Sequence, residues 1–203
     1  MMVKICGIRR QQDAEAAIDH GASAIGFIFW PSSPRFIDPY RARQIAKALP
    51  PFVSTVGVFV NQPREYINGV ASLVPLSVVQ LHGDETPDFA SHLSRPVLKA
   101  VTKRESVREW PKPAMLLVDV HDPVKRGGTG RVVDWSMAAA IARERHIVLA
   151  GGLTPDNVAE AVAAVQPWGI DVSSGVEESP GIKDERRIAA LFAAIHQLRV
   201  PTL

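Results

Sequence analysis

The stretch HIVLAGGLTPDNVAEAVAAVQPWGIDVSSG (146–175) decides the fold that we predict for this chain. It contains a short apolar run (146–150), a loop with two glycines, a segment of helical character (154–165) and a second apolar run. Thr154 is suited to cap the helix, and the proline that follows it fits the first helical turn. Because the helical crossover returns the chain to the same edge, the two strands are expected to pair in parallel.

The same unit recurs along the whole chain. Short apolar, β-branched runs typical of buried parallel strands lie at residues 3–6, 24–29, 54–60, 77–81, 97–101, 115–120, 146–150 and 169–173. Segments of helical character lie at residues 11–21, 38–50, 62–74, 86–93, 105–110, 134–144, 154–165 and 184–198, with the weakest pattern at 105–110. Eight alternating units predict an α/β fold, a single (β/α)8 barrel domain over residues 1–203, near the lower limit of about 200 residues for this fold.

An open, doubly wound sheet is the alternative architecture. Its dinucleotide signature, G-x-G-x-x-G after the first strand, is missing, because CGIRRQ (6–11) holds one glycine. The glycine-rich GGTGR (127–131) is not a phosphate-binding P-loop either, because it lacks the G-x-x-x-x-G-K-[ST] pattern. The barrel is therefore the preferred prediction.

Composition excludes several classes of protein. The net charge is only +2 and no block of Lys and Arg occurs, so we expect no nucleic-acid partner. No apolar stretch is long enough for a membrane span and no signal-peptide pattern opens the sequence, so we expect no membrane partner. Cys6 is the single cysteine, which rules out an internal disulfide and a cysteine-based zinc site. A reducing cytoplasm is the expected compartment.

Polar residues end four of the otherwise apolar strands. Side chains alternate between the two faces of a strand, so the pairs Lys4 with Cys6, and Gln80 with His82, each share one face. Asp119 and Asp171 occupy corresponding places in LLVDV and GIDVS. In a barrel these residues would point inward at the carboxyl ends of the strands, where barrel enzymes have their active sites. A lone buried cysteine is usually inert packing, but four polar strand ends at one rim favour a functional site.

The loops after the last two strands indicate an anion site. The four residues Gly151, Gly152, Ser173 and Ser174, together with Gly175, place small side chains where backbone N–H groups can approach an anion. In (β/α)8 barrels this pair of loops is the recurrent phosphate-binding site. The alternative is that both loops are ordinary tight turns. We favour the anion site, because both loops contain glycine and lie where this fold binds phosphate.

The chain resembles the phosphoribosylanthranilate isomerase family from its first strand to its last. No single matching segment is specific, but their occurrence in this order is. The segments are KICGI (4–8), GFIFWPSSPRFI (26–37), VGVFVN (56–61), VQLHGDE (79–85), LLVDV (116–120), GGTG (127–130), LAGGLTPDNV (149–158) and GIDVSSGVEESPGIKD (169–184).

This resemblance implies an enzyme of tryptophan biosynthesis. The implied reaction is the Amadori rearrangement of N-(5-phosphoribosyl)anthranilate to 1-(2-carboxyphenylamino)-1-deoxyribulose 5-phosphate, with Cys6 as general base and Asp119 as general acid. One acid and one base suffice for ring opening and proton transfer from C2, so no cofactor and no metal are expected. We expect Lys4 to lower the pKa of Cys6, and burial to raise that of Asp119.

The resemblance also implies which residues bind the phosphorylated substrate. Arg35 would pair with the anthranilate carboxylate, and Asp171 would contact the amine region. Gln80 and His82 would line the pocket, and the phosphate would lie on the two glycine-bearing loops described above. Gly128 and Thr129 belong to the loop after the sixth strand, which the resemblance implies covers the site. The chain departs from the family pattern at Arg9, where threonine is usual, and at Val133, where an aromatic residue is usual.

Other interpretations remain open at this stage. A different phosphosugar barrel enzyme, such as an indoleglycerol-phosphate synthase or a pentose-phosphate epimerase, would share the last two loops. An isomerase that also accepts the histidine-pathway aminoaldose would be expected to have aspartate in place of Cys6. A phosphometabolite-binding barrel without catalysis is the non-enzyme alternative. The sequence allows either a monomer or a homodimer.

Overall fold

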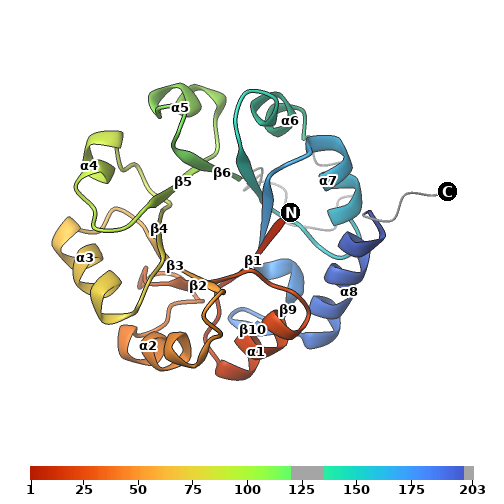
Figure 1. Ribbon diagram of the computed structural model, residues 1–203, viewed down its shortest axis with the longest axis horizontal. Helices are drawn as coiled ribbons and strands as arrows, with labels where there is room; N and C mark the ends of the chain where they lie inside the picture. Colours follow the sequence, from red (N-terminus) through yellow and green to blue (C-terminus); the bar gives the residue numbers. More distant parts are fainter. Residues whose placement is uncertain (120–134, 199–203) are drawn as a thin grey trace.

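Eight parallel strands close into a barrel in the computed structural model, which describes residues 1–119 and 135–198. Each strand pairs with its neighbours in chain order, and β8 pairs with β1 to close the ring (Figure 1). The strands are β1 (Met2–Cys6), β2 (Ala24–Ile28), β3 (Ser54–Phe59), β4 (Val78–Leu81), β5 (Val97–Val101), β6 (Met115–Asp119), β7 (Ile147–Ala150) and β8 (Gly169–Val172). The barrel predicted from the alternating pattern is confirmed.

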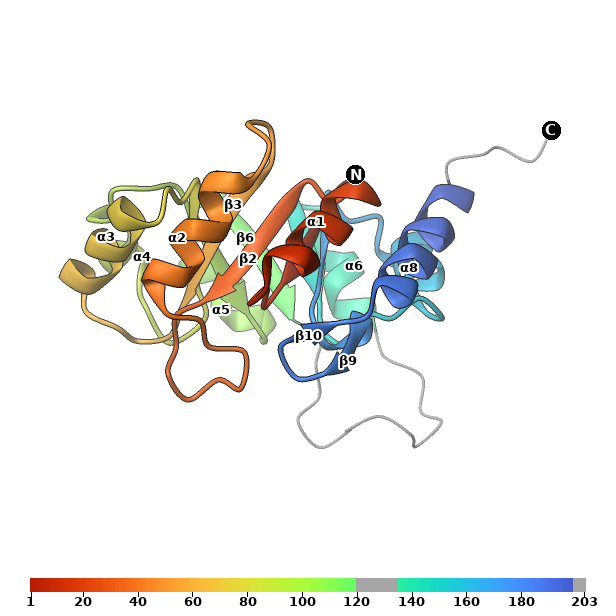
Figure 2. The ribbon, with the colours of Figure 1, turned by 90° about the horizontal axis from the view of Figure 1, so that it is seen from below.

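Helices surround the barrel on its outer face (Figures 1 and 2). In the described ranges they are α1 (Gln11–Asp19), α2 (Pro39–Ala48), α3 (Arg64–Leu73), α4 (Pro87–Ser91), α5 (Arg104–Glu109), α6 (Ser136–Ala142), α7 (Val158–Val165) and α8 (Glu185–Gln197). Asp38 caps α2 by accepting hydrogen bonds from the backbone N–H groups of Tyr40 and Arg41, with Pro39 at the first helical position. The helix predicted at 105–110 is present as α5.

The start of α7 differs from the prediction. Asn157, not Thr154, is the N-cap residue, and the helix begins at Val158. The Asn157 side chain accepts a hydrogen bond from the Thr154 backbone N–H at 2.8 Å and donates one to the Gly152 carbonyl at 3.0 Å. These bonds stabilise a separate turn between β7 and the helix, and they hold the glycine loop in place.

A small hairpin that the sequence pattern did not predict follows β8. It consists of a short 3-10 turn, η1 (Ser174–Val176), and the antiparallel strands β9 (Glu177–Ser179) and β10 (Ile182–Lys183). Figure 2 shows β9 and β10 at one end of the barrel, opposite the end where the N-terminus lies. The hairpin therefore lies at the same end as the carboxyl ends of the strands.

The larger hydrophobic core fills the space between the barrel and the helices. It buries branched and aromatic side chains such as Ile5, Ile25 and Phe27 completely. A smaller cluster, composed of Leu98, Ala100, Leu117, Val148 and Ala150, belongs to the opposite faces of β5, β6 and β7. The strand register aligns Ala100, Leu117 and Val148 with one another, so the cluster forms an apolar part of the barrel interior.

Polar side chains enter the interior from β1 and β8. Lys4 is fully buried and Cys6 is 5% exposed, and the register places Lys4 beside Asp171 and Cys6 beside Gly26. A methyl group on Gly26 would lie 2.9 Å from both Cys6 Sγ and Lys4 Cε. Glycine at this position therefore leaves the space that the two polar side chains occupy.

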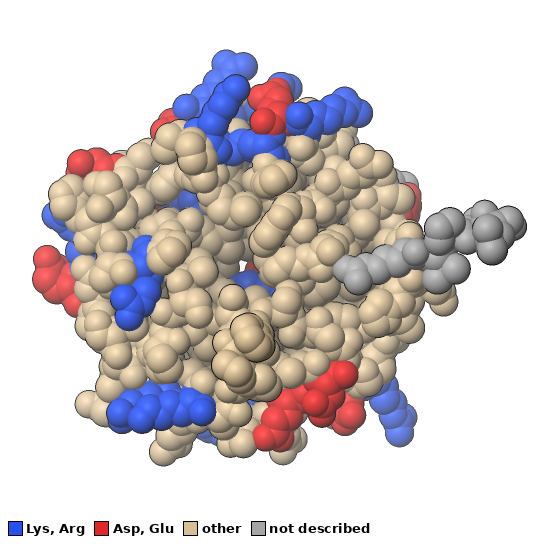
Figure 3. All heavy atoms as spheres, in the orientation of Figure 1, with Lys and Arg blue, Asp and Glu red and all other residues tan. Residues whose placement is uncertain are grey.

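On the face shown in Figure 3, Lys and Arg gather along the upper edge around an acidic group, and Asp and Glu gather at the lower right. The centre of this face is made mostly of uncharged residues. Among the described residues, no helix combines the length and the apolar character that crossing a membrane requires.

The packing around Gly26 predicts an unequal response to two glycine substitutions. Gly26→Ala should lower the free energy of unfolding by about 1–3 kcal/mol, because the added methyl group overpacks the barrel interior. Gly69→Ala is the matched control, because a methyl group there meets no atom within 4 Å and the residue lies in α3. The control should be neutral or more stable by up to about 1 kcal/mol. Urea denaturation measures both, and equal stability of the two variants would contradict this account of the interior.

Candidate active site

A cavity of about 260 Å³ opens at the carboxyl ends of the barrel strands. Every barrel strand except β5 supplies a lining residue at or near its carboxyl end, and the loop between β2 and α2 supplies Arg35. The lining residues are Cys6, Ile28, Arg35, Val58, Gln80, His82, Asp119, Ala150, Gly151, Gly152, Leu153, Asp171, Ser173 and Ser174. The parallel arrangement of the strands thus brings residues from distant parts of the sequence into one site.

Most of the residues selected from the sequence lie in this cavity. Gly175 does not line it, because its backbone lies directly against the Leu153 backbone between the two loops. Gly128, Thr129 and Val133 lie outside the described residues. The apolar lining residues Ile28, Val58, Ala150 and Leu153 were not predicted, because nothing in an apolar strand or loop marks one residue as facing a cavity.

Lys4 forms an ion pair with Asp171 beneath the cavity. Lys4 Nζ lies 2.9 Å from Asp171 Oδ1, and the side chains are 0% and 9% exposed. Burial alone would lower the pKa of Lys4, but the charge of Asp171, with further contributions from Cys6 and from hydrogen bonds, outweighs burial and raises it. Lys4 is therefore a permanent cation in the barrel interior.

The pKa of Cys6 lies above its ordinary value. Burial raises it, Lys4 lowers it through its charge and a hydrogen bond, and the charge of Asp171 raises it again. The expectation that Lys4 lowers the pKa of Cys6 is therefore correct for this one contribution but wrong for the net result, because burial outweighs it. At neutral pH the protein without substrate holds Cys6 as the neutral thiol.

His82 connects two further lining residues. Gln80 Nε2 lies 3.0 Å from His82 Nδ1, and His82 Nε2 lies 3.6 Å from Asp119 Oδ2. If the amide donates to Nδ1, then Nε2 has the ring proton and faces the carboxylate. Asp119 is 20% exposed, so its carboxylate lies between the solvent and the interior. The prediction that burial raises the pKa of Asp119 stays a prediction.

Arg35 reaches the cavity from the loop between β2 and α2. Its guanidinium forms a two-pronged ion pair with Glu177 of β9, with Nη2 to Oε2 at 2.7 Å and Nε to Oε1 at 2.9 Å. Sequence reasoning missed Glu177 because it is one charged residue in a stretch, VEESPGIKD, that resembles an ordinary polar loop. Glu177 lies in the last segment that resembles the family, GIDVSSGVEESPGIKD (169–184), but that segment alone does not identify Glu177 as the partner of Arg35.

The two glycine-bearing loops lie against each other at the rim of the cavity. Gly151 and Gly152 have φ angles of 97° and 63°, in the left-handed region that favours glycine. A side chain on Gly152 would meet no atom within 4 Å, so its backbone faces open space. Bare backbone beside the small side chains of Ser173 and Ser174 is compatible with a bound anion.

Comparisons with known proteins assign the chain to a family. The model of the N-(5'phosphoribosyl)anthranilate (PRA) isomerase family matches residues 3–194. The N-(5'-phosphoribosyl)anthranilate isomerase of Pelobacter propionicus is 47% identical over 201 residues, covering 97% of this chain and 96% of the relative. That of Hahella chejuensis is 46% identical over 205 residues, covering 96% and 93%.

Solved structures of the same family superpose closely on this chain. Phosphoribosyl anthranilate isomerase from Thermotoga maritima has a TM-score of 0.89 at 42% identity, covering 97% of this chain and 99% of that one. Another isomerase structure, in complex with reduced 1-(o-carboxyphenylamino)-1-deoxyribulose 5-phosphate, has a TM-score of 0.86 at 39% identity and covers 97% and 99%. The chain therefore belongs to the phosphoribosylanthranilate isomerase family and is an isomerase of tryptophan biosynthesis.

Proposed function

We propose that this isomerase performs the Amadori rearrangement of N-(5-phosphoribosyl)anthranilate with Asp119 as general acid and Cys6 as general base. The observation that supports the proposal is that both residues line one cavity, from strands β6 and β1. Between these strands lie β7 and β8, whose loops carry the bare glycine backbone. A substrate in the cavity would therefore lie between the two groups.

In the first step Asp119, in its neutral form, donates a proton to the ring oxygen of the ribose. The C1–O bond breaks as the anilino nitrogen supplies its electron pair, which leaves an open-chain iminium ion. His82 Nε2, at 3.6 Å from the Asp119 carboxylate, would stabilise the carboxylate that remains. The positive charge on the substrate acidifies the proton on C2.

In the second step Cys6, after it has released its own proton to the solvent, removes the C2 proton as the thiolate. The electron pair moves into the C1–C2 bond and then to nitrogen, which gives an enolamine that tautomerises to the ketone product. Lys4 favours the thiolate by its charge, while burial disfavours it. A thiolate that forms against this burial is a stronger base than an exposed one, because its conjugate thiol is the weaker acid.

The remaining lining residues would bind the two anionic ends of the substrate. Arg35 would pair with the anthranilate carboxylate, because a guanidinium matches the geometry of a carboxylate. The phosphate would bind at Gly151, Gly152, Ser173 and Ser174, the residues of the two loops that line the cavity. Asp171, already paired with Lys4, would accept a hydrogen bond from the anilino N–H.

A homodimer is the assembly that we propose for this chain. One of the solved structures that resemble it consists of monomers generated from the dimeric isomerase of Thermotoga maritima. That structure has a TM-score of 0.84 at 37% identity and covers 97% of this chain and 98% of its own. The dimeric state of that relative supports the same state here.

The two catalytic assignments predict loss of turnover without loss of binding. Cys6→Ala and Asp119→Asn should each reduce kcat by at least about 100-fold, because each removes a proton-transfer group. The reduced product should still bind to both variants. The loss of substrate fluorescence measures turnover, and calorimetry measures binding. Asp19→Asn, at an exposed position in α1, is the control with unchanged kinetics. Near-wild-type turnover of either active-site variant would rule out its assigned role.

The electrostatic environment of Cys6 predicts opposite shifts in two other variants. In the folded protein the pKa of Cys6 should exceed the value in the chain unfolded by guanidinium, because burial disfavours the thiolate. Lys4→Gln should raise the pKa further, and Asp171→Asn should lower it. The rate of iodoacetamide alkylation as a function of pH measures this pKa without interference, because the chain has one cysteine. Circular dichroism checks that each variant is folded, and shifts in the same direction would contradict the analysis.

A further inference from the structure

The β9–β10 hairpin holds a group of buried charges directly behind Arg35. Glu177 and Lys183 face each other in the hairpin register, and their side chains are 4% and 1% exposed. Lys183 Nζ lies 2.8 Å from Glu177 Oε1, and the Gly181 backbone N–H donates to the same oxygen at 3.2 Å. Neither Glu177 nor Lys183 lines the catalytic cavity. A pair of charges so deeply buried outside the site needs an explanation.

Arg35 links this group to the cavity. Its Nε and Nη2 atoms bind Glu177, so the guanidinium plane is fixed from behind. Within the described part of the chain, Nη1 of Arg35 has no hydrogen-bond partner. Arg35 lines the cavity and its side chain is 22% exposed. One edge of the guanidinium is thus held by the hairpin, while donors remain for an anion in the cavity.

The charges of this group favour an anion in front of Arg35. Burial alone would raise the pKa of Glu177, but hydrogen bonds and charges from Arg35 and Lys183 outweigh it and lower the pKa. Glu177 is therefore ionised at neutral pH. Arg35 and Lys183 both face the one carboxylate of Glu177, and burial lowers the pKa of Lys183 although the charge of Glu177 opposes that shift. Arg35 can thus be held by a carboxylate and still attract a second one.

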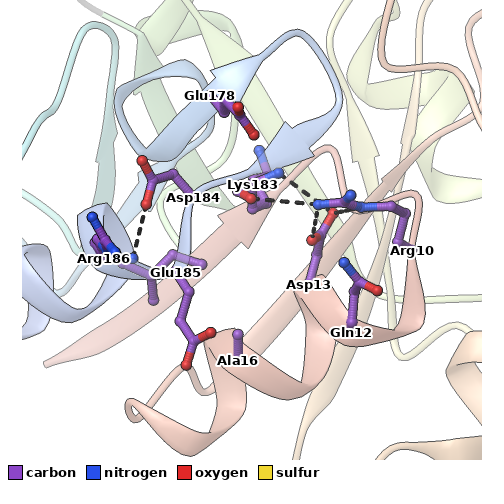
Figure 4. A pocket seen from close by; sticks show the side chains of 10 residues that line it. Arg10, Gln12, Asp13, Ala16, Glu178, Lys183, Asp184, Glu185 and Arg186 are labelled. Atoms are coloured by element: carbon purple, nitrogen blue, oxygen red, sulfur yellow. Dashed lines mark hydrogen bonds and ion pairs between the residues drawn. The ribbon is translucent and has the colours of Figure 1, made fainter.

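Hydrogen bonds from α1 and from Arg10 just before it hold the β9–β10 hairpin on its outer side (Figure 4). Asp13 of α1 is 4% exposed and accepts hydrogen bonds from Arg10, at 2.6 and 2.9 Å, and from the Lys183 backbone N–H at 3.4 Å. Arg10 Nη2 donates to the Lys183 carbonyl at 3.4 Å. These contacts connect α1 to β10, the strand that pairs with β9 and its Glu177.

Arg9 ties the loop of Arg35 to the same hairpin. Its Nη1 donates to the Pro34 carbonyl at 3.1 Å, one residue before Arg35. A side chain on Gly181 would lie 2.6 Å from Arg9 Cδ, so Arg9 crosses the hairpin turn where glycine leaves room for it. The residue that departs from the family pattern therefore packs without conflict.

We propose that Glu177 is a positioning residue that holds the Arg35 guanidinium in the orientation in which it receives the carboxylate of the substrate. This inference rests on the proposed function, in which Arg35 binds the anthranilate carboxylate. An arginine without this partner would lose side-chain freedom on every binding event, which weakens binding. The carboxylate of the substrate is remote from the bonds that change, so the contact stabilises ground state and transition state alike. Glu177 therefore acts on KM and leaves kcat nearly unchanged.

A double-mutant cycle tests the proposal. Glu177→Gln should raise both KM and the Kd of the reduced product by roughly tenfold, a change within the usual range of coupling between contacting charged residues. The effect on kcat should be less than about threefold. In the Arg35→Ala background Glu177→Gln should change neither KM nor Kd, because Glu177 acts through Arg35. Glu178→Gln, the adjacent exposed residue on β9, is the matched control with unchanged kinetics.

The results distinguish a positioning role of Glu177 from a merely structural one, and they distinguish failure of this inference from failure of the proposed function. An equal loss of affinity in both backgrounds, or an unchanged KM in Glu177→Gln, would overturn the inference. If Glu177→Gln fails to fold, Glu177→Asp replaces it, because aspartate retains the charge but has a shorter side chain. A rise in KM with unchanged kcat would support the inference, and a fall in kcat alone would overturn it. A wild-type protein that binds the reduced product but does not turn over the substrate would instead overturn the proposed function.

Discussion

The ion pair between Lys4 and Asp171 is the interaction on which the rest of the site depends. It joins the first strand to the last, so it lies across the seam that closes the barrel. Breaking a buried pair by removing one partner costs about 3–5 kcal/mol, because the other charge is left uncompensated. The same pair lies beneath Cys6 and acts on its pKa from both sides, Lys4 lowering it and Asp171 raising it. The same ion pair therefore both joins the two strands that close the barrel and changes the pKa of Cys6.

The charged and the apolar side chains of the barrel interior come from different strands. The inward faces of β5, β6 and β7 contribute an apolar cluster, and the inward faces of β1 and β8 contribute charges. Gly26 on β2 leaves the volume that the lysine and cysteine side chains need. Arg35 and the glycine-bearing loops reach the cavity from outside the barrel wall, whereas Cys6, Gln80, Asp119 and Asp171 extend into it from the strands. Strands and loops therefore both contribute to the site.

Much of the fold and most of the lining residues could be predicted from the sequence. Eight alternating strands and helices predict a closed parallel barrel. Side chains alternate between the two faces of each strand, and this alternation predicted that Cys6, Gln80, Asp119 and Asp171 face inward. The sign of the Cys6 pKa shift could not be predicted, because it depends on how strongly burial opposes a known neighbouring charge. Glu177 was missed because its partner, Arg35, is 142 positions away in the sequence. Thr154 was predicted as the cap because threonine followed by proline suits that role, and only the loop geometry shows that Asn157 takes it instead.

The central claim is that the substrate lies between an acid on β6 and a base on β1, with its carboxylate at Arg35. A crystal structure of this protein with reduced 1-(o-carboxyphenylamino)-1-deoxyribulose 5-phosphate tests it most directly. The account predicts that the C2 carbon faces Cys6 Sγ, that Asp119 lies on the opposite side of the sugar chain, and that the phosphate rests on the loops after β7 and β8. A ligand whose C2 carbon faces away from Cys6, or whose carboxylate lies far from Arg35, would contradict it.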